Sequence, residues 1–278
     1  MIGPVADKEY VCKHLNIYDV RALKKYGQNF LIDDTLAKNI IDKIDDGNDK
    51  ILLEIGPGLG ALTYHLLEKK GEKVLVEIDS VMVDHLNHQI NDENVEIINK
   101  DFLNVNLNKY DKDIVVVANL PYYVTTDIVE KLIKCPNVKQ MTLMVQKEAY
   151  NRLVSPINTK EYSPISIFIE YLGNVKVIQK VSRHSYIPEP HVDSLVFQIN
   201  VTNDRKYVNE KLFFQVTKAM FKMRRKTILN NLTSYLKDKE KASKILNNLS
   251  CQETMRPEQL DLNFYLKLTD KIKESIID

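Results

Sequence analysis

Short apolar runs alternate with amphipathic stretches through the first half of the chain. The apolar runs have the length of buried strands and cover residues 51–55, 73–78, 94–99 and 113–118. Around them, apolar residues recur at helical spacing over residues 34–45, 60–70, 81–90 and 125–134. Because strand patterns alternate with helical ones, we expect an α/β fold: a mostly parallel, doubly wound sheet with helices on both faces.

Three further strands are expected in the second half. Residues 141–145 predict a fifth strand, and residues 175–181 and 194–201 predict an antiparallel pair that closes the sheet. The loop between the two members of this pair contains Pro188 and Pro190.

The last part of the chain has a different pattern. Residues 203–206 are polar and suit a hinge, and the chain beyond them has helical spacing and no glycine. We therefore predict two domains: residues 1–203, which contain the sheet, and residues 204–278, which form a small all-helical domain.

The strand pattern at 113–118 ends at Asn119-Leu120-Pro121-Tyr122. This sequence suits a site that grips a flat base by its exocyclic amine: the Asn119 side-chain oxygen and a neighbouring backbone carbonyl accept the amine hydrogens, and Tyr122 stacks on the ring. Pro121 stiffens the turn because it fixes φ and lacks an N–H. The plainer alternative is a strand that ends in a Pro-Tyr turn.

A glycine loop follows the strand pattern at 51–55. Gly56, Gly58 and Ala61 fit the G-x-G-x-x-G/A fingerprint, so a dinucleotide site stays open at this point. Glu54 favours a different ligand, since a carboxylate suits a cationic cofactor such as S-adenosylmethionine and repels a pyrophosphate.

Acidic residues also follow the next two strand patterns. Glu77 lies about 20 residues after Gly56, where open α/β sheets place an acid on ribose hydroxyls. Asp101 ends the third strand and can accept an adenine amino group, with Phe102 beside the ring. Each acid alone is typical of a solvated strand end. Together, at the ends of successive strands, they predict a nucleoside-containing cofactor.

These motifs, in this order, resemble the rRNA adenine N6-dimethyltransferases over nearly the whole chain. The N-terminal set is Gly27-Gln-Asn-Phe-Leu31, Glu54-Ile-Gly-Pro-Gly58, Val76-Glu-Ile-Asp79, Lys100-Asp-Phe102 and Asn119-Leu-Pro-Tyr122. The C-terminal set is Gln146-Lys-Glu148, Pro188-Glu-Pro-His-Val-Asp-Ser194, Phe221-Lys-Met-Arg-Arg-Lys226 and Arg256-Pro-Glu-Gln-Leu260.

The resemblance implies a class I S-adenosylmethionine-dependent methyltransferase fold, which is Rossmann-like, and S-adenosylhomocysteine as the product. It implies cofactor contacts from Asn29, Leu31, Glu54, Gly56, Gly58, Glu77, Asp101, Phe102 and Asn119. The implied catalytic residues are Asn119, Leu120, Pro121 and Tyr122.

Two branches of the family share this core. The stretch Lys160-Glu-Tyr162, the Phe-x-x-Arg-Arg-Lys segment and the Arg256-Pro-Glu-Gln-Leu260 tail resemble the branch that modifies the small ribosomal subunit. That branch dimethylates two adjacent adenines in a hairpin loop near the 3′ end of 16S rRNA. The expected partner is thus 16S rRNA within a small subunit or its precursor, and the expected process is rRNA processing in ribosome biogenesis.

Two alternatives stay open. One is a 23S rRNA enzyme that confers macrolide resistance, and the other is a nonenzymatic ribosome-assembly factor. Tyr123 departs from the family pattern, which usually has a basic or polar residue there.

The chemistry expected at Asn119 is an in-line attack by adenine N6 on the cofactor methyl group. Hydrogen bonds from N6 to the Asn119 side chain and a backbone carbonyl favour a pyramidal nitrogen whose lone pair is available. Proximity and alignment supply ~7–11 kcal/mol. The proton leaves readily after methylation, so no general base is required.

The charge of the chain restricts where RNA can bind. With a formal charge of +1, the protein is not uniformly basic, so an RNA-binding footprint must be local. The candidates are Arg21, Lys24 and Lys25 near the N-terminus and Lys222, Arg224, Arg225 and Lys226 in the helical tail. The alternative for the tail cluster is a solvated helix face.

Composition fits an intracellular enzyme with a sizeable core. The 278 residues are 44% hydrophobic, and the 3 cysteines form no C-x-x-C motif. His85 and His88 lie three apart without a third ligand nearby, so no metal site is expected. No apolar stretch reaches ~18 residues, which argues against a membrane span. We expect a cytoplasmic monomer.

Overall fold

The computed structural model describes residues 5–17, 28–202 and 209–277. These residues form two compact units. Unit 1 comprises Met1–Tyr150 and Asn174–Val201, and unit 2 comprises Asn151–Gly173 and Thr202–Asp278. Within the described ranges, no helix is both long and apolar enough to cross a membrane.

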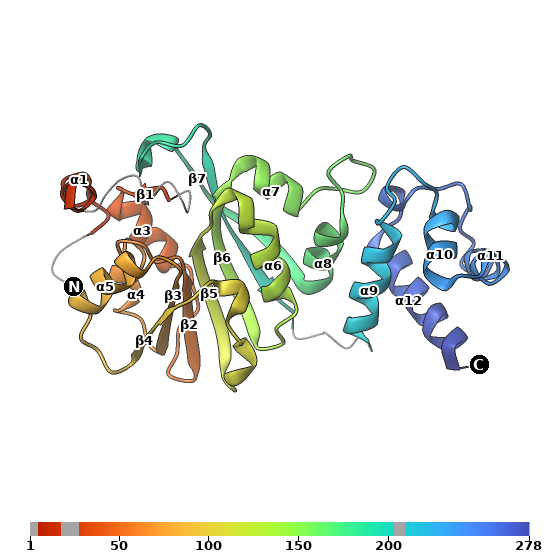
Figure 1. The fold of residues 1–278 in the computed structure, drawn as a ribbon, viewed down its shortest axis with the longest axis horizontal. Helices are drawn as coiled ribbons and strands as arrows, with labels where there is room; N and C mark the ends of the chain where they lie inside the picture. Colours follow the sequence, from red (N-terminus) through yellow and green to blue (C-terminus); the bar gives the residue numbers. More distant parts are fainter. Residues whose placement is uncertain (1–4, 18–27, 203–208, 278) are drawn as a thin grey trace. The chain divides into compact units, whose positions relative to one another are not determined.

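Unit 1 is built on a seven-stranded sheet with the order β4-β3-β2-β5-β6-β9-β7 (Figure 1). Its strands are β2 (Lys50–Ile55), β3 (Glu72–Glu77), β4 (Val95–Asn99), β5 (Asp113–Asn119), β6 (Val138–Gln146), β7 (Gly173–Val181) and β9 (Ser194–Val201). Strands β2 to β6 pair in parallel, and β9 runs antiparallel to β6. Strands β3 and β4 follow β2 on one side of it, and β5 then lies on the other side of β2. This reversal is where open α/β sheets bind ligands.

Strand β5 shows why the sheet is covered on both faces. Residues Ile114 to Ala118 are all apolar and at most 2% exposed. Val115 and Val117 join one core cluster with Ile40 and Ile41 of α3 (Asp34–Ile41). The alternate residues point to the opposite face, because side chains alternate along a strand. The predicted doubly wound, Rossmann-like fold is therefore confirmed.

The remaining elements of unit 1 connect these strands. The helices and 3-10 turns are α1 (Lys8–Ile17), α4 (Thr63–Leu66), α5 (Ser80–Gln89), η1 (Phe102–Asn104), η2 (Leu107–Lys109), η3 (Tyr122–Val124), α6 (Thr125–Ile133) and η4 (Arg183–Ser185). Helix α7 (Lys147–Leu153) begins in unit 1 and ends in unit 2. Strands β1 (Phe30–Leu31) and β8 (Tyr186–Ile187) form a separate antiparallel pair.

Two predicted helices are shorter in the structure. The prediction of a helix over 60–70 is wrong at both ends, because the glycine loop continues to Leu62 and Gly71 takes a left-handed φ of 112°. The helix predicted over 34–45 ends at Ile41. Among the predicted strands, 175–181 and 194–201 are neighbours in the sheet as β7 and β9, and β9 also pairs with β6.

Unit 2 is helical, as the sequence predicts for the C-terminal part. It contains α8 (Pro164–Leu172), α9 (Glu210–Met220), α10 (Ile228–Leu236), α11 (Lys239–Asn248), the 3-10 turn η5 (Pro257–Gln259) and α12 (Leu262–Ile277). Its core includes Phe168, Phe213 and Tyr265, each at most 1% exposed.

The division into units differs from the predicted boundary between residues 203 and 204. Residues 151–173 pack with the C-terminal helices, because Phe168 of α8 lies against two rings of α9. The ring centroids are 5.7 Å apart for Phe213 and 4.7 Å apart for Phe214. The predicted hinge at 203–206 lies outside the described residues.

Candidate functional site

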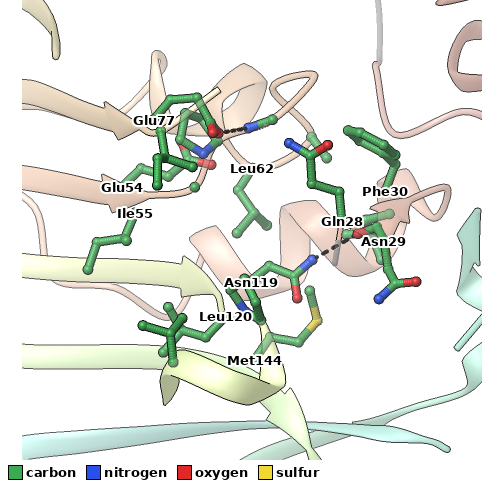
Figure 2. A pocket seen from close by; sticks show the side chains of 18 of the residues that line it. Gln28, Asn29, Phe30, Glu54, Ile55, Leu62, Glu77, Asn119, Leu120 and Met144 are labelled. Carbon is green, nitrogen blue, oxygen red and sulfur yellow. Dashed lines mark hydrogen bonds between the residues drawn. The ribbon is translucent and has the colours of Figure 1, made fainter. Parts of the chain in front are cut away.

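A pocket in unit 1 opens at the carboxyl ends of β2, β3 and β5. Its wall contains the predicted cofactor and target residues Asn29, Leu31, Glu54, Gly56, Gly58, Glu77, Asp101, Phe102, Asn119, Leu120 and Pro121. Figure 2 shows Glu54 and Glu77 on one side of this pocket and Asn119 and Asn29 on another. The fold thus brings together segments that lie far apart in the sequence.

The glycine loop after β2 requires its glycines. Gly56, Gly58 and Gly60 have φ values of 70°, 55° and 92°, in the left-handed region that other residues rarely adopt. A Cβ atom on Gly58 would also lie 3.3 Å from a ring carbon of Phe30. The loop can therefore lie against Phe30 and a ligand only because these positions have no side chain.

Glu77 connects this loop to the end of β3 through hydrogen bonds. Its carboxylate accepts hydrogen bonds from the backbone N–H of Gly58 at 3.0 Å (Figure 2) and from that of Asp79 at 2.9 Å. The side chain is 3% exposed, and burial raises the pKa of Glu77. Each carboxylate oxygen has a second lone pair, so two ligand hydroxyl groups can still donate to Glu77.

Glu54 is the most buried acid of the site. It is 1% exposed, and its carboxyl group accepts a hydrogen bond from the Thr63 hydroxyl at 2.7 Å. Burial raises its pKa to about 8, and the nearby Glu77 carboxylate adds to the increase. Glu54 is therefore mostly protonated at neutral pH before a ligand binds. A cation beside it would favour the ionised form.

Asp101 and Phe102 occupy the turn after β4. The Asp101 carboxylate accepts the backbone N–H of Leu103 at 2.9 Å, which starts the 3-10 turn η1. Phe102 is 4% exposed and lines the pocket. One Asp101 oxygen is used within the turn, and the other can accept a ligand amine.

Asn119 is the last residue of β5. Its side-chain nitrogen donates to the Asn29 carbonyl at 3.3 Å (Figure 2), and its side-chain oxygen is an acceptor that a ligand donor can use. Leu120 N–H donates to the Met144 carbonyl at 3.0 Å, and the Thr125 hydroxyl donates to the Pro121 carbonyl at 2.8 Å. These bonds fix the turn on both sides of Pro121.

Two tyrosines follow Pro121. The side chain of Tyr122 lies outside the described part of the structure. The Tyr123 side chain is 64% exposed and contributes to the pocket wall.

The sequence did not single out several residues of the wall. Val5 and Val11 line the pocket from the N-terminal segment, and Tyr186 lines it beside the β1–β8 pair. These three positions carry no periodic or chemical signal for a ligand. Gln28 and Pro190 also line the pocket and lie within motifs of the family resemblance, but no role in the site was predicted for them. The segments reach the site through a two-residue strand pair and a small apolar cluster.

The C-terminal basic residues divide into two groups. The Arg224 guanidinium donates to the carbonyls of Lys160 at 2.5 Å and Tyr162 at 3.0 Å, so it holds another segment of unit 2. Lys222, Arg225 and Lys226 are exposed. The predicted N-terminal residues Arg21, Lys24 and Lys25 lie outside the described residues.

The histidines of the site region are not arranged as metal ligands. Burial lowers the pKa of His85 to about 4, and its ring contacts the Tyr10 hydroxyl at 3.2 Å. Among the described residues, no three His, Cys, Asp or Glu side chains are grouped to hold a metal ion.

A sheet of this order with a glycine loop and acids at its strand ends defines a Rossmann-like methyltransferase. The structure matches that of a dimethyladenosine transferase from Plasmodium falciparum with a TM-score of 0.74 and 25% identity, over 88% of this chain and 97% of that one. A family model described as "Ribosomal RNA adenine dimethylase" matches residues 20–269. The chain belongs to this family.

Bacterial relatives agree with this assignment. A protein of Clostridium botulinum (strain Okra / Type B1) named "Ribosomal RNA small subunit methyltransferase A" is 38% identical over 93% of this chain and 96% of its own length. A protein of the same name from Clostridium perfringens (strain SM101 / Type A) is 37% identical over 98% and 96%. The predicted family and the predicted enzyme class are confirmed.

The protonation of Glu54 predicts a pH effect on the binding of a sulfonium cofactor. Because a cation favours the carboxylate, binding of S-adenosylmethionine near pH 7 should release a proton, and affinity should rise with pH up to about 8. Calorimetric titration in buffers with different heats of ionisation measures the released proton. The Glu54→Gln variant is the control and should release none.

The same pKa predicts the sign of a stability effect. Since burial raises the folded-state pKa from 4.5 to about 8, the unfolded chain loses this proton first, and stability should fall as pH rises between those values. The pH dependence of thermal melting should flatten in Glu54→Gln. In the calorimetric titration, equal proton release by the wild-type protein and by Glu54→Gln would contradict the assignment of Glu54 to the cofactor site.

Proposed function

We propose that the protein transfers methyl groups from S-adenosylmethionine to N6 of two adjacent adenosines in a hairpin loop near the 3′ end of 16S rRNA. The substrate is the small ribosomal subunit or its precursor, and S-adenosylhomocysteine is the second product. The observation that carries the proposal is the meeting of Glu77, Asp101 and Asn119 in one pocket. The names of the bacterial relatives support the choice of the small subunit.

The cofactor assignment follows from the chemistry of the wall. Glu77 is buried, lines the pocket and suits the two ribose hydroxyls. Asp101 and Phe102 suit the amino group and the ring of adenine. Glu54 and the bare backbone of Gly56 and Gly58 suit the methionine end, which carries an ammonium and a sulfonium. Asn29 and Leu31 form the wall beside Asn119.

The target base is assigned to the end of β5. When bound, the cofactor supplies an electrophilic methyl group. The Asn119 oxygen and a backbone carbonyl of the Leu120–Pro121 turn accept the two N6 hydrogens, so the nitrogen lone pair faces the methyl group. The bonds that fix this turn to Met144, Asn29 and Thr125 keep the acceptors aligned before the base arrives. Stacking on the target ring is proposed for Tyr122.

RNA binding is assigned to exposed cations that do not line the pocket. Lys222, Arg225 and Lys226 are exposed in unit 2 and suit phosphates. Arg21, Lys24 and Lys25 are proposed as further RNA contacts near the N-terminal motif. Arg224 is proposed to act mainly by holding residues 160–162. The enzyme is proposed to act as a cytoplasmic monomer.

Methyl transfer to ribosomal particles tests the proposed function. Small subunits that lack the modification should accept up to four methyl groups, because two adenines each take two. Naked 16S rRNA and large subunits are the controls and should accept far less. Transfer of tritiated methyl groups, followed by mass spectrometry of nuclease fragments, measures both amount and position. Preferential labelling of large subunits would favour the 23S alternative, and no labelling of any particle would favour an assembly factor.

Substitution of Asn119 tests the mechanism. Asn119→Ala removes an acceptor that matters most as N6 becomes pyramidal, so single-turnover methyl transfer should slow by about 10²–10³-fold. Binding of the particle should change little, because phosphate contacts dominate its affinity. Thermal melting checks that the variant is folded. Near-normal transfer by a folded Asn119→Ala protein would contradict the mechanism.

Charge neutralisation tests the RNA-binding surface. Replacing Lys222, Arg225 and Lys226 with Gln should weaken particle binding and flatten its salt dependence, since fewer counterions are released. Arg224 is left in place because its bonds to residues 160 and 162 are internal.

A charge-matched control separates this effect from net charge. Lys239, Lys244 and Lys267 are exposed lysines on α11 and α12, and their triple Gln variant should keep the wild-type salt slope. Equal slopes for the two triple variants would show that the cluster at 222–226 has no special role.

A further inference from the structure

Lys131 on α6 is bonded to the turn that follows β4. Its ammonium group donates to three backbone carbonyls, those of Phe102 at 2.6 Å, Leu103 at 2.9 Å and Val105 at 2.5 Å. It also lies 4.8 Å from the centre of the Phe102 ring. One side chain thus contacts two of the three residues of the 3-10 turn η1 and the residue that follows it.

The three acceptors require the charged form of Lys131. An ammonium group has three N–H donors and a neutral amine has only two, so three carbonyls are satisfied only by the cation. Burial lowers the pKa of Lys131, whereas the Asp101 carboxylate nearby opposes this effect. The carbonyls of the turn therefore stabilise the charged form of Lys131, and the charged form in return stabilises the turn.

The turn itself is a short element. It is a single 3-10 turn, closed by hydrogen bonds from Asn104 N–H to the Asp101 carbonyl at 2.9 Å and from Val105 N–H to the Phe102 carbonyl at 3.0 Å. Short 3-10 segments have poor hydrogen-bond geometry, so bonds from outside the turn add to its stability. Asp101 and Phe102 line the pocket, so their positions matter for ligand recognition.

The helix that carries Lys131 also contacts the turn at residues 119–124, which is proposed to hold the target base. Helix α6 starts directly after residues 119–124, and its first residue, Thr125, bonds to the Pro121 carbonyl. Lys131 lies on that helix and reaches back to the turn after β4. A single helix thus contacts both turns.

We propose that Lys131 is a positioning residue that aims Asp101 and Phe102 at the adenine of the cofactor. The inference rests on the proposed assignment of S-adenosylmethionine to this pocket. Lys131 does not touch the ligand in this account. It sets the direction of the Asp101 carboxylate, so its loss should impair recognition of the adenine amino group more than recognition of the rest of the cofactor.

The test compares two ligands that differ at C6 of the purine, and consequently at N1, which is an acceptor in adenine and carries a hydrogen in hypoxanthine. S-adenosylhomocysteine has the amine, and its deaminated analogue, S-inosylhomocysteine, has a carbonyl oxygen in its place. Wild-type protein should prefer the adenosine ligand by about 10–100-fold, the usual effect of one hydrogen bond to a charged group. Calorimetric titration measures both affinities, and their ratio is the readout.

Lys131→Met keeps an unbranched side chain that is one atom shorter and removes the charge and the donors. We expect the ratio to fall to less than about 3-fold, because Asp101 is no longer aimed. Lys131→Arg keeps the charge and should recover part of the ratio. Lys134→Met is the matched control: Lys134 caps the C-terminal end of the same helix and forms an exposed ion pair with Glu130 at 2.5 Å. It should keep the wild-type ratio.

A merely structural role would lower the melting temperature without changing the ratio between the two ligands. A folded Lys131→Met protein with the wild-type ratio would therefore overturn the inference. If the Met variant does not fold, Lys131→Gln, which keeps two N–H donors on a shorter and neutral side chain, should give a ratio between those of the wild-type and Met proteins, and a wild-type ratio in a folded Gln variant would likewise overturn the inference. Failure of the proposed function is distinguishable, because wild-type protein would then bind neither ligand or would show no preference.

Discussion

The carboxylate of Glu77 is the interaction on which the site depends. It receives the backbone N–H groups of Gly58 and Asp79, and so connects the glycine loop after β2 to the end of β3. The loop has three glycines in the left-handed region, and a backbone this permissive takes its shape from the contacts around it. Because Glu77 is buried, these two hydrogen bonds are not replaced by water, and the position of the loop follows from the register of two central strands.

The distribution of charge follows from the same arrangement. Acidic side chains gather at the strand ends of a nearly neutral protein, and burial weakens their tendency to ionise. Such a pocket suits a cationic ligand with hydroxyl and amine donors, and it is unsuited to phosphate. Contacts with an RNA backbone must then come from other residues, and exposed cations of unit 2 supply candidates. Chemistry and RNA affinity are thus assigned to different side chains, which can be altered independently.

The sequence predicts the central strands and the residues at their ends well. Residues 51–55 and 113–118 are continuous apolar runs because both sheet faces are covered, and a following glycine or proline marks where each strand ends. The pocket residues are predictable for the same reason, since parallel strands bring their carboxyl ends to one edge. The short helix α4 was not predictable from periodicity, because its apolar pattern continues through a glycine loop and past the helix end.

Contacts between residues that lie far apart in the chain could not be predicted from the sequence. The two-residue strands β1 and β8 carry no periodic signal, although their pairing brings Phe30 beside Gly58. In the sequence, Arg224 cannot be distinguished from its basic neighbours. Only the fold shows that its guanidinium donates hydrogen bonds to the carbonyls of residues 160 and 162. Lys131 is one of many helical lysines, and its three acceptors lie in a turn encoded before β5.

A crystal structure with S-adenosylhomocysteine bound tests the central claim most directly. We expect ribose hydroxyls within hydrogen-bond distance of Glu77, the adenine amine on Asp101 with Phe102 beside the ring, and the sulfur facing Asn119. A structure with the ligand reversed in the pocket, so that adenine lies beside Asn119 and the amino acid end beside Asp101, would contradict it. So would a ligand bound at saturation in any other part of the protein.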